Sequence, residues 1–115
     1  MTIIKYLYSK NSVKRKVLDI KDDIKKVVQP YCNEVFIDCY GAYDLDPKYL
    51  VYCVCVQTDN QKIKLKNDEK LNMELRQLLE KHKYPIESQK SVQIGFESQE
   101  TVDRESNGNW YYHFK

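Results

Sequence analysis

Two stretches of the chain carry apolar residues at the three- and four-residue spacing of an amphipathic helix. In the first stretch these residues are Val13, Val17, Ile20, Ile24 and Val27. Asn11 or Ser12 can cap the start of this helix, and Pro30 ends it. In the second stretch the apolar residues are Leu71, Leu75, Leu78 and Leu79. They predict a helix over about residues 68–83, with Asn67 or Asp68 as its cap and Pro85 beyond its end.

Other segments predict strands. Residues 34–40 and 49–57 consist mostly of β-branched, aromatic and cysteine residues, and turn residues separate them, so we expect a hairpin. Apolar and polar residues alternate over residues 92–97, which predicts a third strand. The aromatic run 110–114 follows an Asn-Gly turn signal and predicts a fourth. Residues 98–106 can hold a helical turn before it.

These elements predict a single α+β domain over residues 1–115, with the element order αββαββ. The expected architecture is a mostly antiparallel four-stranded sheet that two helices cover on one face. Residues 2–9 fit neither the helical nor the strand period cleanly, and we favour a helical turn there. Ile63 and Leu65 either extend the second helix or form a separate turn.

Charge is unevenly distributed along the chain, although the net charge is only +2. Residues 1–28 hold eight Lys and Arg against three Asp and Glu, and residues 61–91 hold eight against five. Residues 29–60 hold one against five, and residues 92–115 hold two against four. The helical segments are therefore basic and the strand-bearing segments acidic, so we expect the two signs to lie on different sides of the molecule.

A sheet covered on one face by helices leaves its other face and its loops exposed, and here these parts combine carboxylates with aromatic rings. Aromatic residues are the usual anchors of protein interfaces, and carboxylates attract basic partners. The candidate partner-binding residues are Tyr43, Asp44, Asp46, Glu97, Glu100, Asp103, Trp110 and Tyr111. This surface would repel phosphate, which argues against nucleic acid as its partner.

Three patterns suggest other chemistry. Cys53 and Cys55 point to the same side of one strand, with Cys39 available on its neighbour, so a thiolate metal site is conceivable; small buried side chains are the better interpretation. A small enzyme using His113 or Cys53 would need a pocket with a titratable cluster. A nucleic-acid-binding regulator would use the first helix, through Lys14, Arg15 and Lys16. The favoured prediction is a protein without catalytic residues, cofactor or metal.

The C-terminal segment FESQETVDRESNGNWYY, over residues 96–112, together with the opening YLYSK of residues 6–10, resembles small bacterial immunity proteins. These proteins neutralise the toxins of contact-dependent growth inhibition and related polymorphic systems. The resemblance implies a cytoplasmic, non-enzymatic protein that binds one cognate toxin domain, often a nuclease, and covers its active site. It assigns no individual binding residue. The near-neutral net charge departs from the acidic character common among nuclease inhibitors.

The chain shows neither an apolar secretion signal at its start nor a window apolar enough to span a membrane. We therefore expect a cytoplasmic protein whose four cysteines are thiols.

Overall fold

The structure is a computed structural model that describes residues 5–114. Its helices are α2 (Val13–Val28), η1 (Pro47–Tyr49, a 3-10 turn), α3 (Asp59–Lys66), α4 (Glu69–Lys81), α5 (Ile86–Gln89), α6 (Gln99–Ser106) and α7 (Trp110–Phe114). Its strands are β1 (Phe36–Tyr40), β2 (Val51–Val56) and β3 (Gln93–Ser98). The α+β class is confirmed.

The two long helices form where the apolar spacing predicts them. The side chain of Ser12 accepts a hydrogen bond from the backbone N–H of Arg15 and caps α2, and Asp68 caps α4 in the same way. The inward face of α2 is fully buried through Val17, Ile20 and Ile24, and burial of each such side chain contributes about 1.5–3 kcal/mol. Residues around Ile63 form the separate helix α3, which begins with a capping box between Thr58 and Gln61.

The predicted hairpin is confirmed, because β1 and β2 pair antiparallel with Asp38 opposite Cys53. β2 is the central strand, and β3 pairs with it in parallel, with Cys53 opposite Gly95. The prediction of a mostly antiparallel four-stranded sheet is therefore wrong: the described residues form a mixed three-stranded sheet. The reason is the connection from β2 to β3, which runs through α3, α4 and α5 and so returns the chain in the same direction.

The C-terminal aromatic run was the other error. Residues 110–114 form the short helix α7 rather than a strand, and residues 98–106 form more than a turn, since Gln99–Ser106 is the helix α6. A left-handed residue, Asn107, ends α6, and Gly108 follows it with a positive φ. The favoured helical turn at residues 2–9 falls partly on residues 1–4, which lie outside the described residues.

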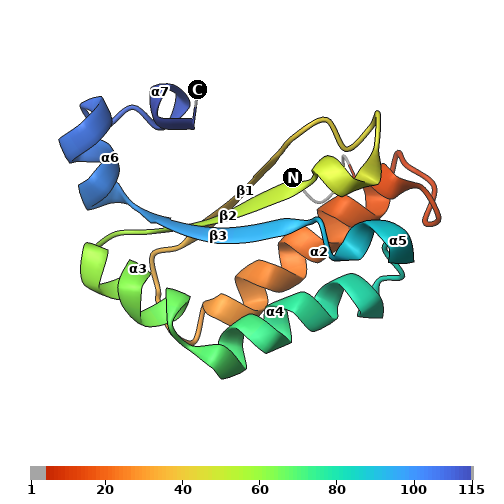
Figure 1. Cartoon of the computed structure of the whole chain (residues 1–115), viewed down its shortest axis with the longest axis horizontal. Helices are drawn as coiled ribbons and strands as arrows, with labels where there is room; N and C mark the ends of the chain where they lie inside the picture. The colour runs from red at the N-terminus through yellow and green to blue at the C-terminus, as the bar shows by residue number, and fades with distance from the viewer. Residues whose placement is uncertain (1–4, 115) are drawn as a thin grey trace.

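The helices lie on both sides of the sheet (Figure 1). α2 and α4 pack on one face and form the main core with the inward side chains of the strands, such as Tyr52 and Val54. α6 and α7 lie on the opposite side, where they cover only part of the sheet. We call this second side the open face. None of the helices in the described part of the chain has the length and apolar character needed to cross a membrane.

Candidate functional site

The open face is the candidate site, and strand alternation determines which side chains form its floor. Since neighbouring residues of a strand point to opposite faces, the register of the three strands defines three rows across this floor. The rows are Tyr40, Val51 and Gln93; Asp38, Cys53 and Gly95; and Phe36, Cys55 and Glu97. None of these nine residues is Lys or Arg, although the chain has 19 such residues.

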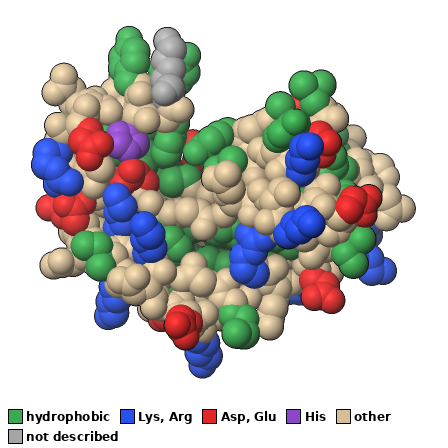
Figure 2. All heavy atoms as spheres, viewed as in Figure 1, with side chains coloured by type: hydrophobic (Ala, Val, Ile, Leu, Met, Phe, Trp, Pro, Cys, Tyr) green, Lys and Arg blue, Asp and Glu red, His purple; other side chains and the backbone are tan. Residues whose placement is uncertain are grey.

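The floor lies between two raised parts of the molecule. At one end stand α6 and α7, and at the other the chain rises through the loop 41–46 into η1 (Figure 1). The surface dips between these two parts (Figure 2). The far loop exposes Leu45, which is 83% accessible, and Tyr49 lies half exposed beside it in η1. The open face is therefore concave and carries exposed apolar groups at its margins.

Aromatic stacking and one row of polar contacts hold α7 on this face. Trp110 packs edge-on against Phe36, with ring centroids 5.1 Å apart, and Phe114 packs against Tyr40 at 5.4 Å. Trp110 Nε1 also donates to Gln99 Oε1 at 2.8 Å. Two of the predicted anchors thus differ in exposure: Trp110 is partly buried under these contacts, whereas Tyr111 is 72% accessible.

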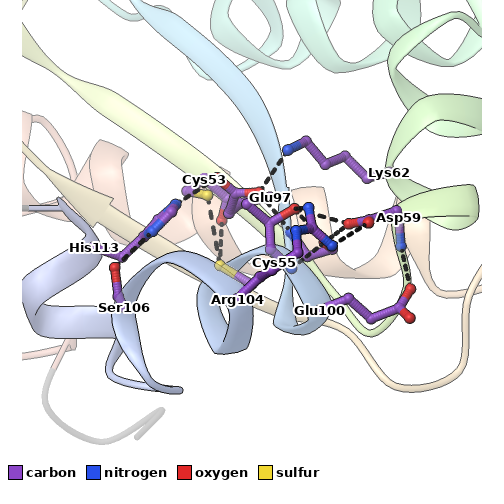
Figure 3. Close-up of polar contacts among 11 residues, drawn as sticks. Cys53, Cys55, Asp59, Lys62, Glu97, Glu100, Arg104, Ser106 and His113 are labelled. Carbon is purple, nitrogen blue, oxygen red and sulfur yellow. Dashed lines mark hydrogen bonds and ion pairs between the residues drawn. The ribbon is translucent and has the colours of Figure 1, made fainter.

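The polar row joins four elements: α3, β3, α6 and α7 (Figure 3). Glu97 Oε1 accepts from Lys62 Nζ at 2.7 Å, and Glu97 Oε2 lies 2.6 Å from His113 Nε2. An ionised carboxylate only accepts, so His113 Nε2 donates to Glu97, and on the other side of the ring His113 Nδ1 lies 3.1 Å from Ser106 Oγ. Burial opposes ionisation of Glu97, but the hydrogen bonds from Lys62 and His113 outweigh it and lower the pKa of Glu97.

Serine, histidine and glutamate in one hydrogen-bonded row are also the residue types of a nucleophilic triad. Such a triad needs N–H groups free to stabilise an oxyanion. The backbone N–H groups that follow Ser106 are committed to the end of α6: those of Asn107 and Gly108 donate to Val102 O, and that of Asn109 donates to Ser106 O. In this arrangement the row serves to attach α7 to the sheet.

The remaining carboxylates predicted at α6 are also engaged within the molecule. Glu100 accepts from the backbone N–H of Asp59 at 2.7 Å, and Asp103 accepts from Gln99 Nε2 at 2.8 Å. Arg104 pairs with Asp59 in the same region. Because α3 packs against β3 and α6, basic and acidic side chains lie side by side here, and the expected separation of the two signs does not hold at this end of the molecule (Figure 2).

The three residues of the loop 41–46 that were predicted to bind a partner lie in different environments. Tyr43 packs partly against the core, and its hydroxyl accepts from Lys14 Nζ at 2.7 Å. Asp46 caps η1 and lies 3.9 Å from Lys48 Nζ. Asp44 is exposed, and no hydrogen bond or ion pair joins its carboxylate to the described residues.

Asp38 is the residue that the sequence interpretation did not select for the site. It is half-buried in the middle row of the floor, and within residues 5–114 its carboxylate has neither a hydrogen bond nor an ion pair. The sequence did carry a signal for Asp38: it lies in a strand, β1, that has few other polar residues. Asp38 and Asp44 are thus acidic groups of the open face that have no partner among residues 5–114.

Cys53 and Cys55 lie on the floor as expected, but Cys39 points to the core side with its register partner Tyr52. The Cys55 thiol donates to Cys53 Sγ at 3.6 Å, and this hydrogen bond together with burial raises the pKa of Cys55. Thiolates, not thiols, bind metals well. Among residues 5–114 no three His, Cys, Asp or Glu side chains are grouped to hold a metal ion.

The basic residues of the alternative function are used within the fold. Lys14 donates to Tyr43, Arg15 is buried against Asp19 at 3.1 Å, and Lys16 donates to the Lys83 carbonyl at 3.0 Å.

Comparison with protein-family models, with curated proteins and with solved structures found no match to this chain.

Proposed function

We propose that this protein is an immunity-type inhibitor that binds a basic toxin domain, such as a nuclease, on its open face and covers the toxin's active site. The observation that supports this proposal is the concave floor of the open face, which holds no Lys or Arg and is bordered by exposed aromatic and apolar side chains. Concave surfaces with aromatic anchors and a single sign of charge favour a protein partner of the opposite sign.

Inhibition on this proposal is steric. The open face, within the described residues, offers no activated nucleophile. The Cys55 thiol is held protonated, and the polar row from Ser106 to Glu97 attaches α7 to the sheet. Affinity would come from apolar burial at the centre, and the rate of association from the free carboxylates of Asp38 and Asp44. The nucleic-acid alternative is less well supported, because Lys14, Arg15 and Lys16 already have partners within the chain.

The test is binding of the purified toxin domain encoded beside this gene, measured by calorimetry with wild type and with the double variant Asp38→Asn, Asp44→Asn. We expect the double variant to bind about tenfold more weakly at low salt, with the difference narrowing as salt screens the charges. The matched control is Glu74→Gln, Glu80→Gln, which removes two exposed carboxylates from α4 on the other face of the sheet. It should bind as wild type.

Reversal of Glu97, Glu100 and Asp103 is a poor test of the same idea. Glu97 and Glu100 hold Lys62, His113 and the start of α3 in place, and Asp103 bonds Gln99 within α6. A wild-type protein that binds no such toxin domain would reject the immunity proposal. Equal affinity of both double variants would reject the open face as the binding surface. Salt-sensitive binding to an oligonucleotide, lost when Lys14, Arg15 and Lys16 are replaced, would support the alternative instead.

A further inference from the structure

Gly95 occupies a position in which the fold itself does not require glycine. It lies in the middle of β3, on the open face, with ordinary extended backbone. A Cβ atom added at Gly95 would meet no other atom within 4 Å, so no close neighbour excludes a side chain. A glycine inside a strand weakens the strand, and it often marks a place where another molecule approaches closely.

The space above Gly95 is a hollow with a defined lining. Its volume is about 280 Å³, and its apolar side chains include Tyr40, Val51, Cys53 and Phe114, with Gln93 and Glu97 at the β3 side. Pockets that hold cofactors and other small molecules usually measure roughly 300–1,000 Å³. The Gly95 hollow is smaller than that range and equals the volume of about nine water molecules, at roughly 30 Å³ each. It is suited to one large side chain.

We infer that the Gly95 hollow is the anchor pocket for an apolar or aromatic side chain of a basic protein partner. This inference rests on the proposed function and names where the partner's central side chain binds. The charge of the residues around the hollow indicates which kind of partner would bind there. Within residues 5–114 Asp38 has neither a hydrogen bond nor an ion pair, and it lies in the same row as Gly95. The floor itself contributes Asp38 and Glu97 and no Lys or Arg, so it stays net negative even though Lys62 pairs with Glu97.

Other occupants fit this surface less well. The phosphates of a nucleic acid would meet the Asp38 carboxylate, which no cation of residues 5–114 pairs with, and a Glu97 whose partner Lys62 is already engaged. In a symmetric dimer each surface patch faces its own copy, so a second copy of this chain would bring the Asp38 carboxylates of both copies to one interface. A basic polypeptide avoids both conflicts.

The test is a series of side chains of increasing size at Gly95: Gly95→Ala, Gly95→Leu and Gly95→Trp. Because the added atoms enter empty space, we expect each variant to unfold at or above the wild-type temperature. We expect affinity for the toxin domain encoded beside this gene to fall with size, from less than threefold for alanine to a hundredfold or more for tryptophan. The matched control is Ser91→Trp, which adds the same ring at an exposed position just before β3.

The outcomes separate this inference from the proposed function. If wild type binds the toxin domain and the folded leucine and tryptophan variants bind it equally well, the anchor pocket is wrong while the inhibitor proposal stands. If wild type binds no toxin domain, the proposed function fails and the inference fails with it. If wild type forms a dimer that Gly95→Trp dissociates, the occupant is a second copy, which also overturns the inference. The leucine variant decides the question if the tryptophan variant does not fold.

Discussion

At the scale of single residues, Asp59 is a carboxylate beside α6 that accepts hydrogen bonds from three side chains. Its side chain accepts from Ser98 Oγ at 2.5 Å and from Thr101 Oγ1 at 2.8 Å. It also accepts from Arg104 Nη1 at 2.8 Å (Figure 3). These donors, the Ser98 hydroxyl first, hold the pKa of Asp59 far below its usual range. Asp59 thereby joins the first turn of α3 to the first turn of α6.

This contact predicts a specific acid sensitivity. The folded pKa of Asp59 is depressed, so its stabilising effect is complete well above the unfolded pKa of about 3.9. The effect is lost progressively as the pH falls from about 5 towards the folded pKa. We expect Asp59→Asn to melt below wild type at pH 7, with the gap closing towards pH 2. Thermal unfolding across this pH range measures the effect. Asp44→Asn is the control, and a gap that stays constant with pH would contradict the assignment.

Residue types along the chain could not distinguish engaged carboxylates from free ones. Glu97, Glu100 and Asp103 were reasonable candidates because they are acidic and close to aromatic residues in sequence. Their partners come from α3 and from α6 itself, and contacts between segments distant in sequence depend on the tertiary fold. For the same reason Asp38, an acid expected on the exposed face of the sheet, was not among the selected binding residues, although within residues 5–114 its carboxylate has no partner.

At the scale of elements, α7 depends on its contacts with the sheet. Its five residues are far fewer than the 12–15 or so that an isolated helix needs in water. It is retained by Trp110 and Phe114, one turn apart, which pack on Phe36 and Tyr40, and by His113 bonded to Glu97. Phe36 and Glu97 flank Cys55 in the register, so α7 covers that thiol, which has no exposed surface.

Trp110→Ala should therefore release α7 without unfolding the domain. We expect the thiols of Cys53 and Cys55 to react about tenfold faster with a thiol reagent under native conditions, since a lost contact of about 1.4 kcal/mol raises the open population tenfold. The matched control is Tyr111→Ala, which truncates an exposed ring of the same helix. Thiol reactivity equal to wild type in a folded Trp110→Ala protein would show that α7 does not protect these thiols.

The elements that the sequence predicted correctly are those whose apolar residues face the main core: α2, α4, β1, β2 and β3. The errors arose where tertiary contacts override local preference. The run from Trp110 to Phe114 consists of strand-forming residues, yet it is helical because that geometry brings two rings onto β1. The direction of β3 follows from the crossover helices before it, which the predicted helix over 68–83 already implied.

At the scale of the whole molecule, the sheet separates the side that forms the main core from the open face, which is accessible to a partner. α2 and α4 seal one face with the main core, while the other carries Asp38, the Gly95 hollow and the exposed rings of α7. The distribution of net charge by segment suggested such a division, although Lys62 of α3 and Arg104 of α6 place basic side chains at the α6 end. The central claim of this account is that a basic protein partner binds the open face.

Hydrogen–deuterium exchange of the protein, alone and with the purified toxin domain encoded beside its gene, tests that claim most directly. We expect the toxin to slow exchange in β1, β3, α7 and the loop 41–46, and to leave the outer surfaces of α2 and α4 unchanged. Protection confined to α2 and α4, with the open face exchanging as it does in the free protein, would contradict the account.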